Sequence, residues 1–432
     1  MKLIASVTLK MKKVILPQFI STLYKHNIDI NMINLTESDG RWEDYTIEII
    51  YSSKKDLVRL VDTLNKNSEY FQDITVTSTL EDKIRGGVLT TSSKIEIENI
   101  NDVWTALIGG NKLIHEKIDT GLQKNYCASF NSIALISGVK IKNGSDISSH
   151  YYHLYADSER DSVLIGKFTG RNAFPLVIRY NSIEDMIKTV KGIEENFCCL
   201  RIMNNDEDDY LLSNIIDAVT KPLIFKELDE NPVHYLAVIN TLIRNHTITP
   251  GDTSVGIIGL DNSTIRLTAL LVKSGYMKVL GHDSNERQMM SFENRKGLAT
   301  TVENVISNSD ILMIMDEKIS HDYINSFRAG QVIISGINSD MGDSAVLKDK
   351  GIREFIKIEE TESLSLLPAL INAIIVSSKR YFSDDMLISI ADLVSKQMEK
   401  KYDLPGLYSG ISKEIENLIV KEKNISTPEN EF

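Results

Sequence analysis

The sequence predicts an α/β protein organised around a doubly wound parallel sheet. Three stretches indicate this fold class. Residues 253–283 read as strand, tight turn, helix and strand, residues 131–252 alternate short apolar strands with amphipathic helices, and residues 1–80 give a βαββαβ order of their own. Strands that alternate with helices in this way form parallel sheets, because each crossover helix covers a face of the sheet.

The composition narrows the class of protein. A chain of 432 residues predicts two or three domains. The 60 acidic residues against 48 basic ones give a net charge of −12, which argues against nonspecific nucleic-acid binding and against attachment to anionic membranes. No secretory signal and no apolar run long enough to span a membrane occur, and the 3 cysteines are typical of a reducing compartment. We therefore expect a cytoplasmic protein with neither nucleic acid nor membrane as a partner.

Residues 1–80 are predicted to form a ferredoxin-like module. Apolar residues recur at helical spacing over 16–23 and alternate along a strand over 45–51. Together with the phrase HNIDINMINL, this order resembles an ACT domain, a regulatory module that often binds amino acids and pairs with a second copy. The resemblance implies a small-molecule or amino-acid effector. However, the first strand–helix turn reads Leu9 to Lys13 where the family has Asp or Asn, Pro and Gly, so a dimerisation module without a ligand stays open as the alternative.

The rest of the chain is predicted to divide into a connector (residues 81–130), an α/β domain (131–252), a Rossmann-type domain with C-terminal helices (253–420) and a frayed tail (421–432). In the connector, a short helix is expected to end at Gly109-Gly110. In the first α/β domain, Val163 to Ile165, Leu176 to Ile178 and Cys198 to Met203 are expected to be strands.

The turn at Gly259 carries the candidate dinucleotide site. A nucleotide-binding turn has three glycines so that the backbone can approach a pyrophosphate, and an acid about 20 residues further on for a ribose hydroxyl. Here the three positions read Gly259, Asp261 and Thr264, Asn262 lies in the same turn, and Asp283 is the acid. Asp261 would place a carboxylate where phosphates bind. The alternatives are weak binding of NAD and a unit kept only as a scaffold.

Several motifs together resemble the bacterial NAD-dependent malic enzymes that carry an N-terminal ACT domain. They are Arg85-Gly86-Gly87 after the first module, GKFTGRNAFPLVI, FCCLRIMN, the Rossmann-type unit and YFSDDMLISIADLVSKQ. The resemblance covers nearly the whole chain in the order of its elements. It implies a malic-enzyme-like α/β domain, NAD as the cofactor, and a homo-oligomer. It also implies oxidative decarboxylation of malate to pyruvate by a lysine base, a tyrosine acid and a divalent metal held by three carboxylates.

Residue by residue, the match places other side chains at the positions that this chemistry needs. The tyrosine acid falls on Leu107 and the lysine base on Asp161. The adjacent Glu-Asp metal pair falls on Met203-Asn204, and only a shift in register places Glu227 at the third metal ligand. Leucine cannot donate a proton, and methionine is a poor ligand for a hard cation.

Two asparagines match positions near the substrate of the family. Asn338 lies in SGINSD and Asn372 further on, although both also fit as ordinary loop or helix-cap residues. The sequence therefore predicts a degenerate malic-enzyme-like protein that has lost the metal and acts in binding or regulation. The alternative is an active NAD-dependent malic enzyme, which requires a Tyr, a Lys and three acids to converge on one cleft.

Overall fold

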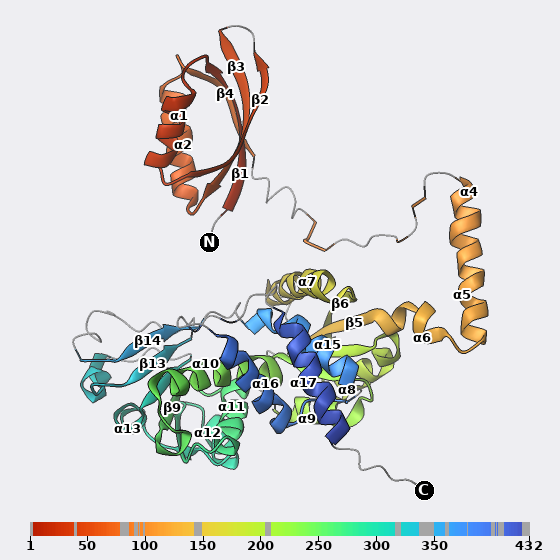
Figure 1. Cartoon of the computed structure of the whole chain (residues 1–432), viewed down its shortest axis with the longest axis vertical. Coiled ribbons are helices and arrows are strands. Elements are labelled where there is room, and N and C mark those ends of the chain that lie inside the picture. The colour runs from red at the N-terminus through yellow and green to blue at the C-terminus, as the bar shows by residue number, and fades with distance from the viewer. Residues whose placement is uncertain are drawn as a thin grey trace. The chain divides into compact units, whose positions relative to one another are not determined.

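A computed structural model divides the chain into two compact units, Met1–Thr91 and Ser92–Phe432. It describes residues 3–38, 41–77, 86–89, 94, 96–97, 100–141, 149–203, 209–315, 321–336, 350–358, 363–377, 379–398, 402, 404 and 410–425. The fold is α/β, with an antiparallel sheet in the first unit and two parallel sheets in the second (Figure 1). The predicted fold class is therefore confirmed, and the domain boundaries assigned from the sequence stay predictions.

The first unit has the predicted βαββαβ order. Its elements are β1 (Leu3–Lys12), α1 (Leu16–Lys25), β2 (Asp29–Ser38), β3 (Trp42–Tyr51), α2 (Lys54–Lys66) and β4 (Phe71–Thr77). The strands form one antiparallel sheet in the order β2-β3-β1-β4, and both helices cover the same face of it (Figure 1). Alternate residues such as Val7, Ile47 and Ile49 are fully buried beneath the helices, with Phe19 and Leu23 opposite them.

The helical segment that opens the second unit differs from the prediction. Helix α4 (Ile100–Asp102), the π-helical turn η1 (Val103–Ile108) and α5 (Gly109–Asp119) follow one another directly. Gly109-Gly110 therefore lie within the helical run, and the prediction that they end it is wrong. A glycine inside a helix costs only about 1 kcal/mol, which the flanking turns can offset. Helix α6 (Gln123–Tyr126) and the 3₁₀ turn η2 (Ala128–Asn131) complete this segment.

A four-stranded parallel sheet follows. Its strands are β5 (Ser132–Lys140), β6 (Asn172–Tyr180), β7 (Cys199–Met203) and β8 (Leu223–Phe225), in the order β6-β5-β7-β8. Its helices are α7 (Ser149–Thr169), α8 (Ile183–Ile193), the 3₁₀ turn η3 (Glu194–Asn196) and α9 (Asp209–Ala218).

The strand predicted at Val163 to Ile165 is wrong, because these residues lie within α7. The buried positions of α7 include Leu154, Ser158, Asp161 and Ile165, which recur at helical spacing. A run of three apolar residues cannot by itself distinguish a strand from a turn of buried helix.

The second sheet of this unit has six parallel strands. They are β9 (Ser254–Ile258), β10 (Lys278–His282), β11 (Leu298–Ala299), β12 (Ile311–Ile314), β13 (Val332–Ser335) and β14 (Glu354–Lys357). Their order, β11-β10-β9-β12-β13-β14, is that of a dinucleotide-binding doubly wound sheet. The helices between these strands are α11 (Asn262–Lys273), α12 (Glu286–Asn294), α13 (Val302–Asn308) and the 3₁₀ helix η6 (His321–Ser326).

The two parallel sheets share one apolar core. Three elements connect β8 to β9: the π-helical turn η4 (Lys226–Glu230), α10 (Asn231–His246) and the 3₁₀ turn η5 (Pro250–Asp252). Four elements follow β14: η7 (Ser363–Ser365), α15 (Leu367–Ser377), α16 (Asp384–Gln397) and α17 (Ile411–Ile425). One cluster of buried side chains joins Ile133 of β5, Leu236 of α10, Val255 of β9 and Leu370 of α15. Because α17 extends to Ile425, the first five residues of the predicted tail are helical, and residues 426–432 lie outside the described part.

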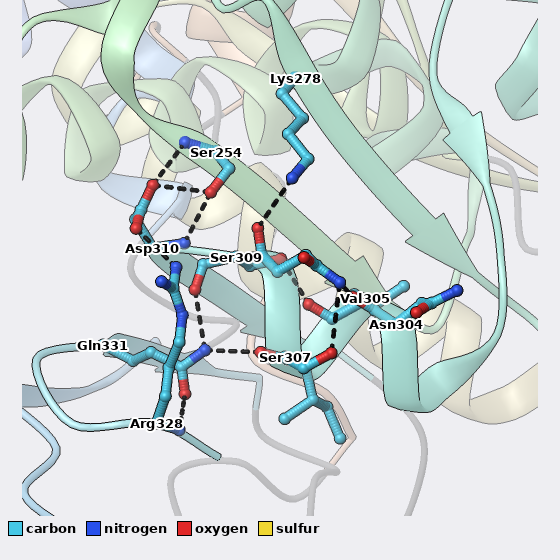
Figure 2. A network of polar contacts seen from close by, with 11 residues as sticks. Ser254, Lys278, Asn304, Val305, Ser307, Ser309, Asp310, Arg328 and Gln331 are labelled. Carbon is cyan, nitrogen blue, oxygen red and sulfur yellow. Dashed lines mark hydrogen bonds and ion pairs between the residues drawn. The ribbon is translucent and has the colours of Figure 1, made fainter. Parts of the chain in front are cut away.

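A polar network fixes the amino end of the six-stranded sheet (Figure 2). The Asp310 carboxylate accepts hydrogen bonds from Ser254 N–H over 2.9 Å and from Ser254 Oγ over 2.6 Å, and it pairs with Arg328 over 2.6 Å. Gln331 Nε2 donates to the carbonyl oxygens of Ile306 and Ser309. Ligands of such sheets bind at the carboxyl ends of the strands, so this network is part of the scaffold.

Candidate functional site

The turn between β9 and α11 lies at the carboxyl edge of the six-stranded sheet. Gly259 has a φ of +84°, a conformation that glycine adopts without strain, and Asp261 is the N-cap residue of α11. Thr264 N–H donates to Asp261 Oδ1 over 2.7 Å, and Asp261 N–H donates to Thr264 Oγ1 over 2.8 Å. This capping box satisfies the N–H group of Thr264, in the first turn of α11, with the Asp261 carboxylate. The N–H groups of a first helical turn otherwise bind a phosphate.

Asp283 lies beside this turn, as the sequence predicts for an acid at the end of the second strand. Its Oδ2 accepts the N–H of Leu260 over 2.7 Å, and its Oδ1 accepts the N–H of Asn285, also over 2.7 Å. The carboxylate therefore ties the tip of β10 to the turn after β9. Each carboxylate oxygen keeps a second lone pair, so the position is compatible with a ribose hydroxyl.

The carboxyl edges of the two parallel sheets meet at the start of α11. Asn262 Nδ2 donates to Glu227 Oε2 over 3.2 Å, and Asn231 Nδ2 donates to Ser263 Oγ over 3.1 Å. Asn262 is buried, and its Oδ1 accepts no hydrogen bond in the described part of the chain. The structure thus brings together three of the predicted site residues, Glu227, Asp261 and Asn262, from two different sheets. Two carboxylates and an amide oxygen make this corner unsuited to an anionic ligand.

A buried ion network lies behind β7. The Arg201 guanidinium is fully buried and makes two parallel bonds to Glu230, Nε to Oε1 over 2.6 Å and Nη2 to Oε2 over 2.8 Å. Its Nη1 donates to Asp161 Oδ2 over 2.8 Å, and Met203 Sδ lies against the same nitrogen. Arg160 pairs with the other oxygen of Asp161 over 2.8 Å. Burial alone would lower the pKa of Arg201, but the two carboxylates raise it above its ordinary value.

Two of the site residues assigned from the sequence lie in this network. Asp161, at the position of the base, is 1% exposed and held in ion pairs on both oxygens. Met203, at a metal-ligand position, is buried and contacts Arg201. Asn204, the second residue of that pair, lies outside the described residues. In the part of the chain that the structure describes, no group of three or more His, Cys, Asp or Glu residues could hold a metal ion.

The last three site residues assigned from the sequence make no hydrogen bond with Glu227, Asp261 or Asn262 in the described part of the chain. Leu107 lies in η1 and is 45% exposed, in a segment (residues 100–131) that has no buried residue. Asn372 lies within helix α15 and is partly buried. Asn338 lies outside the described residues, so its predicted role stays a prediction.

Sequence reasoning missed Arg201, Glu230 and Asp229. The signal for Arg201 was present, because an arginine inside the apolar strand CCLRIM must find buried counter-ions. Asp229, fully buried in η4, accepts the N–H of Phe225 over 2.8 Å. Burial raises the pKa of Asp229 to about 7, even though that hydrogen bond and the charge of Arg266 act to lower it.

Known structures resemble this chain across its larger part, whereas neither a protein-family model nor a curated protein matches its sequence. The NAD-dependent malic enzyme of Thermotoga maritima aligns with a TM-score of 0.65 and 14% identity, covering 79% of this chain and 99% of that one. The malic enzyme of Pyrococcus horikoshii aligns with a TM-score of 0.64 and 15% identity, covering 78% and 87%. That of Entamoeba histolytica aligns with a TM-score of 0.63 and 13% identity, covering 79% and 80%.

The fold is that of the malic enzymes. Identity this low establishes the fold alone, since one fold supports many activities. The malic-enzyme-like architecture expected from the sequence is thereby confirmed. None of the helices in the described part of the chain has the length and hydropathy that a membrane span needs.

Proposed function

We propose that this chain is a degenerate relative of the malic enzymes that has lost oxidative decarboxylation and acts as a binding or regulatory protein. The observation that carries the proposal is the state of Asp161. A general base needs a free lone pair directed at the substrate. The Asp161 carboxylate instead is buried and paired with Arg201 and Arg160. A carboxylate that is 1% exposed and paired with two guanidinium groups is not accessible to a substrate.

The cofactors follow from the same reasoning. Binding of NAD is expected to be weak, because the Asp261 carboxylate lies at the start of α11 and already accepts the Thr264 N–H there. A divalent metal is expected to be lost, because Met203 and Asn204 stand at two ligand positions and only Glu227 at the third offers a charge. Glu227 is itself bonded to Asn262.

A second candidate is an active NAD-dependent malic enzyme. One observation favours it. The βαβ unit is intact, and Asp283 lies beside the turn with lone pairs free to accept a ribose hydroxyl. The two candidates differ in whether malate and a dinucleotide are consumed, which a turnover assay decides.

Self-association is part of the proposal, with a second copy of this chain as the partner. Nine large apolar side chains between residues 100 and 130 are 37–66% exposed: Ile100, Trp104, Leu107, Ile108, Leu113, Ile118, Leu122, Tyr126 and Phe130. A stable interface takes about 800 Å² of surface from each partner. Large exposed apolar side chains gathered in one segment mark interaction surfaces.

Charge also favours a second copy at this surface. Three acids (Asp102, Glu116, Asp119) and three lysines (Lys112, Lys117, Lys124) make the segment neutral within a chain of net charge −12. Two copies can therefore approach there without mutual repulsion. An antiparallel arrangement brings Asp102 of one copy toward the lysines near the far end of the other.

The N-terminal unit supplies the regulatory part of the proposal. Its ferredoxin-like sheet is consistent with an ACT-like module that takes an amino acid or another small effector. A cytoplasmic location belongs to the same proposal, on the strength of three free cysteines in a chain of this length.

The test of binding is isothermal titration of the full chain with NAD, NADP and the common amino acids, without metal. The expected result is saturable heat with one amino acid or small effector and weak heat, or none, with either dinucleotide. Heat from none of these ligands argues against the effector role. Tight binding of NAD instead favours the active-enzyme candidate.

A further inference from the structure

We propose that Arg201 is a built-in cation that replaces the divalent metal ion of this fold and joins α7, β7 and η4 without one. The inference deepens the proposed function and rests on it in one respect, the alignment of Met203 with a metal ligand. Everything else comes from the geometry of the buried network.

The geometry is that of a buried cation with a partner on each of its three nitrogens. All five N–H groups of a guanidinium are donors, and no group of Arg201 can accept a bond or release the charge. Its three nitrogens make four contacts: the two bonds to Glu230, one to Asp161 and the contact with Met203 Sδ. Arg201 and Glu230 are both 0% exposed, and Asp161 is 1% exposed. A charge this deep must be paired, because the interior does not solvate it.

The three partners come from three separate elements. Asp161 lies on α7, Arg201 and Met203 lie on β7, and Glu230 ends η4. A divalent ion joins distant carboxylates in the same manner, by drawing side chains from several elements to one point. Here the point is occupied by a guanidinium on the strand itself. The chain therefore carries its own counter-ion for Asp161 and Glu230, and α7, β7 and η4 are joined at this point whether or not a metal is present.

The proposed replacement depends on the charges of two nearby residues on β7, Arg201 and Met203. Met203 brings no charge to its ligand position, while two residues earlier Arg201 brings a positive one. Two carboxylates that would repel each other in a dry interior are neutralised by this one cation and by Arg160 at the surface. A metal ion added to this cluster would meet carboxylate oxygens that are already in use.

The first experiment uses the unaltered protein and Mn²⁺ alone. Electron paramagnetic resonance is expected to find no bound Mn²⁺, and the Tm is expected to stay within about 2 °C in Mn²⁺ and in EDTA. One tightly bound Mn²⁺ per chain, with a matching rise in Tm, overturns the proposal. That outcome would leave the loss of malate turnover untouched, so the two proposals fail separately.

The second experiment removes the cation. Arg201→Ala leaves two buried carboxylates facing each other, so its Tm is expected to fall by about 10 °C. It is also expected to gain a site for one Mn²⁺ with a Kd below about 1 mM, seen by resonance and by recovery of the Tm. The matched control is Arg328→Ala, which removes the surface partner of Asp310 and is expected to gain no Mn²⁺ site. An Arg201→Ala protein that keeps its Tm, or that binds no Mn²⁺, contradicts the replacement.

A third variant covers the case in which Arg201→Ala does not fold. The triple variant Asp161→Asn, Arg201→Met, Glu230→Gln removes all three charges together and keeps similar side-chain volumes. Its comparison is the double variant Asp161→Asn, Glu230→Gln, in which the buried guanidinium has lost both charged partners. The triple variant is expected to fold with the higher Tm of the two. The reverse order of stability would show that the network is not governed by the charge of Arg201 and would overturn the proposal.

Discussion

Asp261 and Thr264 cap helix α11 reciprocally, each side chain bonding the backbone N–H of the other over 2.7–2.8 Å. A capping box of this kind stabilises a helix by about 1 kcal/mol. At this position it has a second effect, because the donors it uses lie at the edge of the sheet where a dinucleotide would place its phosphates. One pair of side chains thus stabilises the fold and opposes the ligand.

The first prediction concerns that pair. Asp261→Gly removes a carboxylate that repels a phosphate about 4 Å away by roughly 1–4 kcal/mol, and it frees the backbone for close approach. Binding of NAD, near millimolar or absent in the unaltered chain, is expected to tighten by about tenfold or more. Recovery should be partial, because Thr264 keeps its bulk at the third glycine position. Isothermal titration measures the change.

Asp261→Asn is the matched control, since asparagine still caps the helix but carries no charge. Its affinity for NAD should lie between those of the unaltered chain and Asp261→Gly. If the unaltered chain already binds NAD at micromolar concentration and neither substitution matters, then Asp261 is not the obstacle.

The second prediction concerns pH and Asp310. Burial acts to raise the pKa of this carboxyl, but the hydrogen bonds from Ser254 and the charge of Arg328 outweigh it and lower the pKa below its ordinary value. A lowered pKa in the folded state means that the charged form stabilises the fold above about pH 4, and that this contribution is lost as the pH falls further. Asp310→Asn should therefore cost roughly 1 kcal/mol at pH 7, a modest amount because the side chain is 44% exposed.

Urea unfolding of both proteins between pH 7 and pH 2.5 measures this effect. The gap between their midpoints is expected to close below about pH 4. A gap that stays constant over the whole range would show that the Asp310 charge contributes nothing to the stability of the sheet edge.

The third prediction concerns the exposed helical segment. Trp104→Glu, at a residue 62% exposed, places a charge within the apolar surface of residues 100–130, so it should convert a dimer into a monomer. Light scattering measures the mass of both proteins. Thr105→Glu, which adds the same charge at a neighbouring polar position, should leave the dimer intact. A monomeric mass for the unaltered chain, or equal masses for all three, contradicts pairing through this segment.

Much of the fold could be predicted from the sequence, because its signals are local. The alternation over residues 45–51 and the apolar strand at 255–258 each identify a strand without help from the rest of the chain. The strand predicted at Val163 to Ile165 is wrong, because a short apolar run has the same composition in a strand and in a buried helix. Gly109-Gly110 misled, because a glycine signals a helix end only when the following residues cannot continue the helix.

The candidate site was predictable only where its residues are close in sequence. Asp261 and Thr264 are three residues apart, so their effect on the turn could be inferred directly. Asp161, Arg201 and Glu230 are spread over 70 positions, and the parallel pairing of β5 with β6 and β7, and of β7 with β8, brings together the elements that carry them. The sequence predicts Asp161 at the position of the base, but it does not reveal that Asp161 pairs with Arg201.

The most direct test of the account is turnover of L-malate by the purified chain with Mn²⁺ and either NAD or NADP, followed by the absorbance of the reduced nicotinamide. An active malic enzyme assayed under the same conditions is the control. The account predicts no reduced nicotinamide above background, because Asp161 is held by Arg201 and Leu107 carries no proton. Turnover near one per second, an ordinary rate for an enzyme, would contradict the loss of catalysis and establish the chain as an active dehydrogenase.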